Sequence, residues 1–296
     1  MNVETKFKDT MLPFLSLVSK RLPDDVMTRL RQMQAQEDSP LQKELYDTMF
    51  ENLQLAVEKD KPCCQDTGLL HFYIKAGAEF PYLGRLEGWL SDCVRTATKQ
   101  IPLRPNTVNF FEEKISDDGI GERIPWIHWE IVPDSDAAEI TAYFGGGGCC
   151  FPGQAKVFTP SQGYAAIPEF LFEVVTKKGL NACPPVIIGV GLGENIENAA
   201  VLSKIACLRE LGTSHPNPRG AEMERMLLEK VNSLGIGAQG MRGKQYALAV
   251  HVESSGRHTA TFAVAISLAC YVHRRGIIRF DKNLNYRLKH YEGVAL

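Results

Sequence analysis

The chain has 296 residues, 44% of them hydrophobic, and its 33 basic and 35 acidic residues give a formal charge of −2. A chain of this length can bury one large core or two smaller ones, and its apolar content is that of an ordinary folded protein. The near-neutral charge, without long like-charge runs, argues against nucleic-acid binding, so an anionic ligand would need a local cluster of positive groups.

The first residues show no targeting signal. Residues 1–10 mix charges of both signs ahead of a short apolar run, unlike the basic-then-apolar layout of a signal peptide. The longest apolar stretch, about 259–272, is roughly fourteen residues, below the ~20 that span a bilayer. We therefore expect a cytoplasmic protein, not bound to a membrane, whose eight cysteines stay reduced.

A helix is predicted from Ser39 to near Pro62. Ser39 can cap it, and Gln42 stands at the position of a capping box. Apolar side chains then recur every four residues and predict its buried face, at Leu41, Leu45, Met49, Leu53 and Val57. The helix ends just before Cys63 and Cys64, which therefore begin a loop.

Three strands and a helix are expected next. Residues 70–76 alternate in the manner of a strand, and residues 86–99 are typical of a helix. Residues 126–132 and 138–144 both have strand patterns. The sequence Pro133-Asp134-Ser135-Asp136 between them has turn chemistry and favours a hairpin.

The second half continues this alternation. Helices are expected over 170–177, 196–211 and about 223–234, and strands over 186–188 and 246–252. The final apolar run is interpreted as a helix that follows Gly256-Arg257-His258 and carries Cys270. The class is therefore α/β, with mixed strands and helices in one domain over 1–296 and a lobe division near 145–150, at the glycine run.

Three cysteines stand in distinctive contexts: Cys64, Cys183 and Cys270. No CxxC pair exists, which excludes the local spacing of zinc knuckles and ferredoxins. Any metal site must therefore be assembled from distant segments. Cys93 and Cys207 lie within helical patterns and are expected in the core, as is His251 on its strand.

Four motifs occur in a fixed order. They are Cys64-Gln65-Asp66-Thr67-Gly68, the glycine run 145–148, Asn181-Ala182-Cys183-Pro184-Pro185, and Gly256-Arg257-His258 followed by Cys270. Together they resemble the N-terminal half of class I fumarases and the α subunits of L(+)-tartrate dehydratases, over nearly the whole chain. The resemblance implies that domain's fold and a [4Fe–4S] cluster bound by Cys64, Cys183 and Cys270, with one open iron as a Lewis acid.

The resemblance also implies which residues meet the substrate: Gln65, Asp66, Arg104, Gly147 and His258. Asp66 and His258 would be catalytic, orienting or moving protons, and Gln65 would donate a hydrogen bond. The rigid fork of Arg104 suits a carboxylate, and Gly147 permits close backbone approach. Taken alone, the same residues are typical of a polar turn, a solvated arginine and an interlobe hinge.

The substrate is the finer question. Residues 149–153 and 125–134 look closer to the tartrate dehydratase α subunits than to fumarases, so the resemblance implies a hydro-lyase that converts L(+)-tartrate to oxaloacetate. The alternative within the family is the α subunit of a two-subunit fumarase, acting on malate and fumarate. Two further alternatives are a non-catalytic iron–sulfur regulatory protein and a nucleotide-binding protein, the latter because of Gly189-x-Gly191-x-Gly193.

A partner is expected as well. One-chain class I fumarases continue into a second catalytic domain, whereas this sequence reaches Leu296 after a short polar stretch. The remaining catalytic groups, including the base, are therefore expected on a separate β subunit, in an α2β2 heterotetramer. The chain alone is expected to be inactive.

Overall fold

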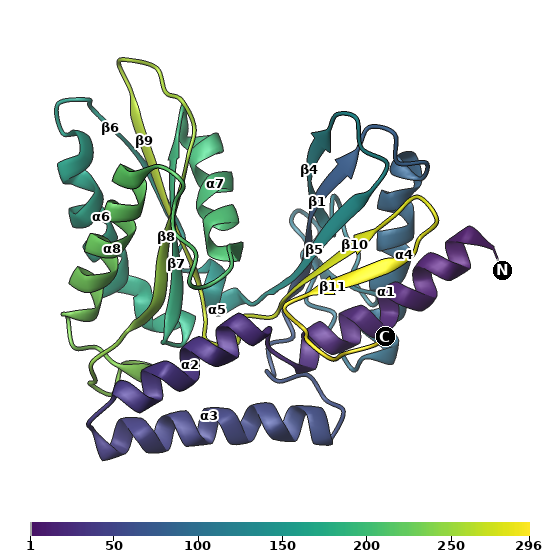
Figure 1. Ribbon diagram of the computed structural model, residues 1–296, viewed down its shortest axis with the longest axis horizontal. Coiled ribbons are helices and arrows are strands. Elements are labelled where there is room, and N and C mark those ends of the chain that lie inside the picture. The colour runs from purple at the N-terminus through teal and green to yellow at the C-terminus, as the bar shows by residue number, and fades with distance from the viewer. Residues whose placement is uncertain (1) are drawn as a thin grey trace. The chain divides into compact units, whose positions relative to one another are not determined.

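The computed structural model describes residues 2–296, which divide into two compact units (Figure 1). Unit 1 contains the chain up to Asp24, Glu51–Gly146 and His273–Leu296, and unit 2 contains Asp25–Phe50 and Gly147–Val272. The chain passes from unit 1 to unit 2 inside the glycine run, between Gly146 and Gly147. Strands and helices are mixed in both units, so the predicted α/β class is confirmed.

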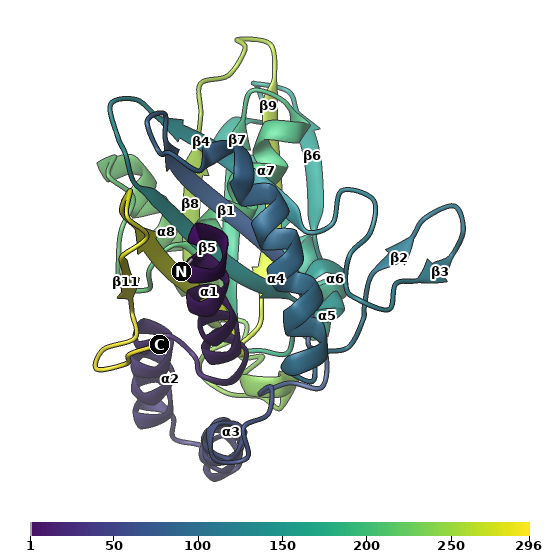
Figure 2. The ribbon, with the colours of Figure 1, turned by 90° about the vertical axis from the view of Figure 1, so that its right-hand side faces the viewer.

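Unit 1 is built on a five-stranded sheet in the order β11-β10-β5-β1-β4. The strands are β1 (Leu69–Gly77), β4 (Trp126–Val132), β5 (Ala138–Gly145), β10 (Arg275–Phe280) and β11 (Tyr286–Lys289). A separate two-stranded hairpin, β2 (Val108–Asn109) and β3 (Lys114–Ile115), extends away from this sheet (Figure 2). The predicted strand over 70–76 is confirmed, and its alternate residues are buried.

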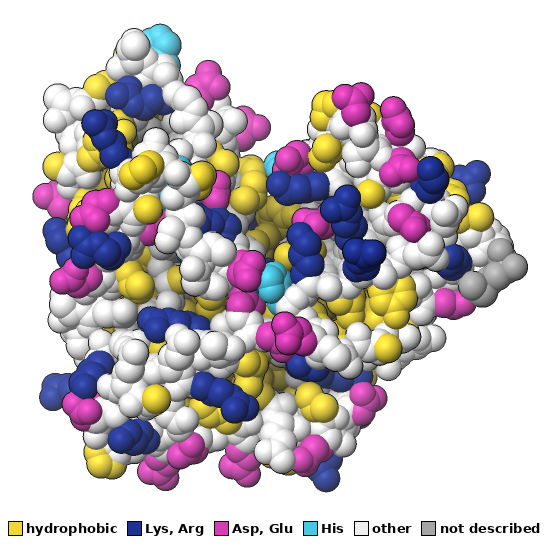
Figure 3. Space-filling view, viewed as in Figure 1, with side chains coloured by type: hydrophobic (Ala, Val, Ile, Leu, Met, Phe, Trp, Pro, Cys, Tyr) yellow, Lys and Arg dark blue, Asp and Glu magenta, His cyan; other side chains and the backbone are white. Residues whose placement is uncertain are grey.

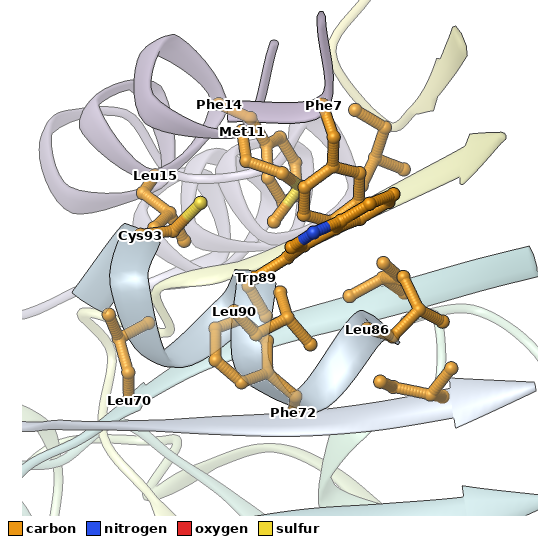
Figure 4. Packing of buried hydrophobic residues seen from close by; sticks show 14 of the residues in the cluster. Phe7, Met11, Phe14, Leu15, Leu70, Phe72, Leu86, Trp89, Leu90 and Cys93 are labelled. Atoms are coloured by element: carbon orange, nitrogen blue, oxygen red, sulfur yellow. The ribbon is translucent and has the colours of Figure 1, made fainter. Parts of the chain in front are cut away.

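The core of unit 1 lies between the sheet and two helices, α1 (Val3–Lys20) and α4 (Leu86–Gln100), as Figure 4 shows. The Phe7 ring lies 5.2 Å from the rings of both Trp89 and Phe280. Fully burying one such side chain contributes about 1.5–3 kcal/mol. The apolar side chains of β1 therefore hold both helices on one side of the sheet. The alternate side chains of β1 point to the other side of the sheet, which is left for polar groups.

Unit 2 has a four-stranded sheet in the order β6-β9-β7-β8. Its strands are β6 (Gln154–Phe158), β7 (Val186–Gly193), β8 (Ala247–Ser254) and β9 (Phe262–Ala269). Its helices are α2 (Asp24–Gln36), α5 (Gly147–Cys150), α6 (Ala166–Lys178), α7 (Ile196–Leu208) and α8 (Pro218–Asn232). The predicted helices and strands of this half are present, except for the last. In Figure 1, α7 covers one face of the sheet and α6 and α8 cover the other.

The glycines of β7 face α7. A Cβ on Gly189 would lie 1.9 Å from the Ser203 carbonyl oxygen, and one on Gly191 would lie 1.9 Å from that of Ala199. The alternating glycines therefore serve close packing of a helix on a strand. They do not form a phosphate-binding loop, so this motif gives no support to the nucleotide alternative.

The helix α3 (Pro40–Glu58) begins and ends close to where the sequence predicts, and its buried face matches the prediction at Met49 and Leu53 but not at its two ends. Leu41 is 52% exposed and Val57 is 55% exposed, whereas Gln42 and Tyr46 are buried. Ser39 Oγ accepts the Gln42 backbone N–H as predicted. The Gln42 side chain does not complete a capping box, because its amide bonds the backbone of Ala238 instead.

The predicted hairpin of β4 and β5 is wrong. Both strands pair with β1, which lies between them, and β4 runs parallel to β1 while β5 runs antiparallel. Turn chemistry between two strands therefore did not decide their pairing. A strand from much earlier in the chain supplies the alternating apolar face that both neighbours flank.

The predicted helix before Cys270 is also wrong, because residues 262–269 form the strand β9. This strand is an interior member of its sheet, and it is buried on both faces. A strand of that kind has a continuous apolar sequence that periodicity cannot distinguish from a buried helix. This correction changes where His258 and Cys270 lie.

The surface carries both signs of charge, interspersed on the face shown in Figure 3. Across residues 2–296, none of the helices combines the length and the apolar character needed to cross a membrane.

Candidate functional site

Unit 1 presents the Cys63–Gly68 loop between α3 and β1. The two adjacent cysteines differ, because Cys63 is buried while Cys64 is half-buried. The Cys63 thiol donates to the Ser19 carbonyl oxygen at 3.3 Å, and Asn52 Nδ2 donates to the Cys63 carbonyl oxygen. Burial raises the pKa of Cys63 to about 11, against the nearby positive charge of Arg274. Cys63 therefore anchors the loop as a thiol and presents Cys64.

The next residues of the loop hold Arg104. Thr67 is buried, and its hydroxyl oxygen accepts the Arg104 backbone N–H at 2.8 Å. Asp66 Oδ1 accepts the Gly68 N–H at 3.0 Å, and the Asn106 amide lies 3.5 Å from the same oxygen. The structure thus brings Cys64, Gln65, Asp66 and Arg104 onto one side of unit 1. Gln65 and Arg104 are exposed, and the Arg104 guanidinium has no ion pair among the described residues.

A second arginine lies here that the sequence analysis missed. Arg274 is 2% exposed, yet its Nε and Nη1 have no hydrogen-bond partner in the part of the chain that the structure describes. Its guanidinium lies over the Phe144 ring, 5.8 Å from the centroid. A Cβ on Gly146 would lie 2.8 Å from Asp66 Oδ2 and 3.8 Å from Arg274 Nη2. Gly146 therefore allows the carboxylate and the buried guanidinium to approach its backbone together.

Unit 2 carries the other two candidate cysteines. Ile187 of β7 pairs with Ala269 of β9, so the start of β7 and the end of β9 lie at the same end of the sheet. Cys183 precedes β7 and is exposed, with a left-handed backbone at φ 51°. Cys270 follows β9 directly and is half-buried. Both cysteines therefore lie at one end of this sheet.

Gly147 and its neighbours lie at that same end. Gly147 begins the short helix α5, which contacts β9 and the 3-10 turn Gly179–Ala182 that precedes Cys183. A Cβ on Gly148 would lie 2.5 Å from the Asn181 carbonyl oxygen. Glycine is thus required for close backbone packing at Gly148, while Gly147 is exposed beside it.

The structure does not bring His258 to the cysteines of unit 2. His258 lies in the loop that enters β9, and Cys270 lies beyond the other end of that eight-residue strand (Figure 1). At ~3.3 Å per residue the strand alone separates them by roughly 26 Å. Arg257 fixes this loop, because its Nη1 donates to the carbonyl oxygens of His258, Thr259 and Thr261 at 3.0, 3.3 and 3.0 Å.

Two cysteines and one histidine predicted to be structural are confirmed as such. Cys93 and Cys207 are fully buried in α4 and α7, and burial raises their pKa values to about 12 and about 11. His251 is buried on β8, with Nδ1 3.2 Å from the Ala206 carbonyl oxygen. None of the eight cysteines is in a disulfide.

Within residues 2–296, no three His, Cys, Asp or Glu side chains lie close enough together to hold a metal ion. Cys64 belongs to unit 1, whereas Cys183 and Cys270 belong to unit 2. The candidate site is therefore described as two parts: Cys64–Asp66 with Arg104 and Arg274 on unit 1, and Gly147 with Cys183 and Cys270 on unit 2.

Comparison with known proteins supports one family. A family profile described as fumarate hydratase (Fumerase) matches residues 8–279. The L(+)-tartrate dehydratase subunit alpha of Escherichia coli (strain UTI89 / UPEC) is 45% identical over 281 residues, covering 95% of this chain and 93% of that protein. The protein of the same name from strain K12 is 44% identical with the same coverage. A protein of Methanocaldococcus jannaschii is 34% identical over 284 residues, covering 94% of this chain and 100% of its own length.

Proposed function

The chain belongs to the fumarate hydratase family of hydro-lyases, and on that premise we propose that it is the iron–sulfur subunit of an L(+)-tartrate dehydratase. The proposed reaction removes one hydroxyl of L(+)-tartrate and a proton from the neighbouring carbon, which gives water and an enol that tautomerises to oxaloacetate. The observation that carries the proposal is the 45% identity to a tartrate dehydratase α subunit over 95% of the chain. The proposal includes a cytoplasmic location for the protein.

The proposed cofactor is a [4Fe–4S] cluster bound by Cys64, Cys183 and Cys270. These residues fit that role because Cys64 and Cys270 are half-buried and Cys183 is exposed, so all three are accessible, whereas Cys63 is buried. Arg274 fits it too, since Nε and Nη1 of this buried guanidinium have no hydrogen-bond partner in the described chain and can donate to an anionic group. When bound, such a cluster with one open iron supplies a Lewis acid for the departing hydroxyl.

The residues around Cys64 would bind the substrate. Arg104 presents a planar guanidinium to one carboxylate, with its backbone fixed by Thr67. Gln65 donates its amide N–H to a hydroxyl or carboxylate oxygen. The exposed backbone of Gly147 leaves room for the substrate at the cysteine end of unit 2.

Asp66 is proposed as the proton-transfer group of this chain. Its carboxylate is oriented by the Gly68 N–H and packs against Gly146. A carboxylate held in one orientation can accept or return a proton without reorganising. The base that takes the carbon-bound proton is proposed to lie on a separate subunit.

That separate β subunit, in an α2β2 assembly, is proposed from the names of the relatives, which are α subunits. The β2–β3 hairpin is a candidate for contact with that subunit, because Phe110 and Phe111 at its tip are 93% and 94% exposed in the isolated chain. Exposed apolar groups of this size mark interaction sites. We assign this tip to the β subunit, so the double substitution F110S/F111S is expected to reduce co-purification of the two subunits while the isolated chain stays folded.

One experiment tests the function. The chain is purified anaerobically, alone and with its β subunit, and assayed with L(+)-tartrate and with fumarate. Oxaloacetate formation by the pair and not by the chain alone is expected. Activity of the isolated chain, or hydration of fumarate in preference to dehydration of tartrate, contradicts the proposal. The fumarase alternative is retained because the matching family profile is described by that activity.

A further inference from the structure

Unit 2 contains a cavity of about 540 Å3 that the proposed dehydratase function does not use. It lies where β7 and β8, which run parallel, both end, at Leu192 and Gly193 on one strand and Val252 and Ser254 on the other. Ligand pockets occupy roughly 300–1,000 Å3. In α/β sheets they form beside the carboxyl ends of parallel strands.

The polar side of the cavity is cationic. Arg219, Arg257 and His215 line it, and none of its described lining residues is acidic. The Arg219 side chain makes neither an ion pair nor a hydrogen bond within residues 2–296. All the hydrogen bonds of Arg257 use Nη1, so Nε and Nη2 have no hydrogen-bond partner in the described chain. Two guanidinium groups without carboxylate partners therefore border one cavity.

His215 adds a ring N–H donor with a fixed position. Its Nδ1 accepts the Asn217 backbone N–H at 3.0 Å, so in the neutral ring the hydrogen is on Nε2. The ring packs on the first turn of α8 so closely that a Cβ on Gly220 would lie 2.4 Å from Nδ1. The absence of a Cβ at Gly220 therefore allows the imidazole to pack against the helix in this position. Its Nε2 remains available as a donor.

Two acids behind this wall, Glu224 and Glu253, share the guanidinium of Arg209. Glu224 is buried, and its Oε1 lies 2.6 Å from Arg209 Nη1, while Glu253 Oε1 lies 3.4 Å from the same atom. The two oxygens of Glu224 also accept the backbone N–H groups of Val252 and His215, each at 2.8 Å. The Glu224 carboxylate thus fixes the frame of the cavity, and both acids face Arg209 without lining the cavity themselves.

Another part of the cavity wall is apolar. The Phe262 and Tyr164 rings meet edge to face, with centroids 5.2 Å apart and an interplanar angle of 85°. Met223 lines the same cavity, and the Arg257 guanidinium lies over the Phe262 ring at 5.3 Å. Cationic donors and an apolar wall thus share one cavity, which suits a ligand with a charged head and an apolar body.

We propose that this cavity binds an organic anion, with a phosphate or carboxylate group held by Arg219, Arg257 and His215. Its aromatic or aliphatic body packs against Tyr164 and Phe262. The site is distinct from the proposed cluster position, because Cys183 and Cys270 lie at the other end of the same sheet.

Calorimetric titration of the full-length chain tests this with three probes that share parts: inorganic phosphate, phenyl phosphate and benzoate. Phenyl phosphate, benzoate or both are expected to bind at least tenfold more tightly than inorganic phosphate. The tighter of the two aromatic probes shows whether the site prefers a phosphate or a carboxylate. The substitution R219Q is expected to weaken binding about tenfold, as for loss of a charged hydrogen bond. Y164A, at a side chain that is 65% exposed, is expected to weaken the aromatic probes and leave inorganic phosphate unchanged.

The matched control is R225Q. Arg225 lies on the same helix but outside this cavity, where it pairs with Glu222 at 2.6 Å. Its substitution is expected to leave binding unchanged. Equal affinity for inorganic phosphate and both aromatic probes, an equal loss in R219Q and R225Q, or no binding in the millimolar range overturns the proposal.

Discussion

The backbone N–H of Arg104 donates to the hydroxyl oxygen of Thr67 at 2.8 Å, which ties the proposed carboxylate-binding arginine to the loop of Cys64. Removing that hydroxyl in T67V is expected to raise the KM for tartrate roughly fivefold, the equivalent of one hydrogen bond of about 1 kcal/mol. T67S keeps the hydroxyl and is expected to match the wild type. R104K keeps the charge but loses the planar fork, and is expected to raise KM at least tenfold. Unchanged steady-state kinetics in R104K would remove Arg104 from the site.

The two adjacent cysteines form a matched pair of substitutions. C64S is expected to abolish the broad violet absorbance of a reconstituted cluster and the activity, because a proposed ligand is lost. C63S is expected to keep both and to lower only the free energy of unfolding, since Cys63 is a buried anchor hydrogen-bonded to Ser19. Absorbance spectra of both variants after anaerobic reconstitution, together with their thermal unfolding curves, distinguish these outcomes. The reverse pattern would move the cluster ligand to Cys63.

Arg274 is expected to serve function at a cost in stability. Its Nε and Nη1 lack hydrogen-bond partners among residues 2–296, so R274M is expected to stabilise the cluster-free chain. Replacing buried charge by an apolar side chain of similar volume stabilises by about 1–4 kcal/mol in favourable cases. The same variant is expected to retain less cluster and less activity. R279M, at an exposed arginine of β10, the strand that begins directly after Arg274, is the control. A destabilised cluster-free R274M chain would contradict this interpretation.

His258 can serve the proposed cluster site only from a second copy of the chain, because β9 separates it from Cys270 by roughly 26 Å. Chains carrying H258N and chains carrying C270S are each expected to be inactive with the β subunit. Mixed before assembly, they are expected to regain about one quarter of wild-type activity, since half of randomly formed dimers are mixed and each restores one of two sites. Full activity of H258N alone would instead exclude His258 from catalysis.

Alkaline conditions are expected to weaken the fold through Cys207. Burial raises the pKa of its thiol from 9.0 to about 11, so the folded chain keeps a proton that the unfolded chain releases between these values. The contribution of this thiol to stability is fully present below the unfolded pKa and is lost as pH rises through the folded one. Between about pH 8 and about pH 10.5, the wild type should lose more free energy of unfolding than C207A. C150S, at an exposed cysteine, should follow the wild type.

The sequence predicted best where one face of an element is buried. The strand β1 was predicted because Leu70, Phe72 and Ile74 alternate with polar residues. The strand β9 was mistaken for a helix because burial on both faces removes that alternation. Pairing was the least predictable feature, since β1 is inserted between β4 and β5 by contacts that no local pattern encodes.

The candidate site divides in the same way. Cys64, Asp66 and Arg104 were predicted from motifs, and all three belong to unit 1, where the Arg104 backbone N–H donates to Thr67 of the same loop as Cys64 and Asp66. Thr67 and Asn106 lie beside predicted residues, and their polar side chains near a turn were an available signal. Arg274 gave none, because burial of a guanidinium depends on Phe144 and Gly146, which are distant in sequence.

The position of β10 in the sheet of unit 1 sets an order for folding during synthesis. All four strands of the sheet in unit 2 have been synthesised once Ala269 has been added. The sheet of unit 1 is still incomplete at that point, because β5 pairs on one side with β10, which begins at Arg275. Until then, an unpaired edge of β5 is open to association with other chains. Unit 1, although it contains the N-terminus, is therefore the last part of this protein to be completed.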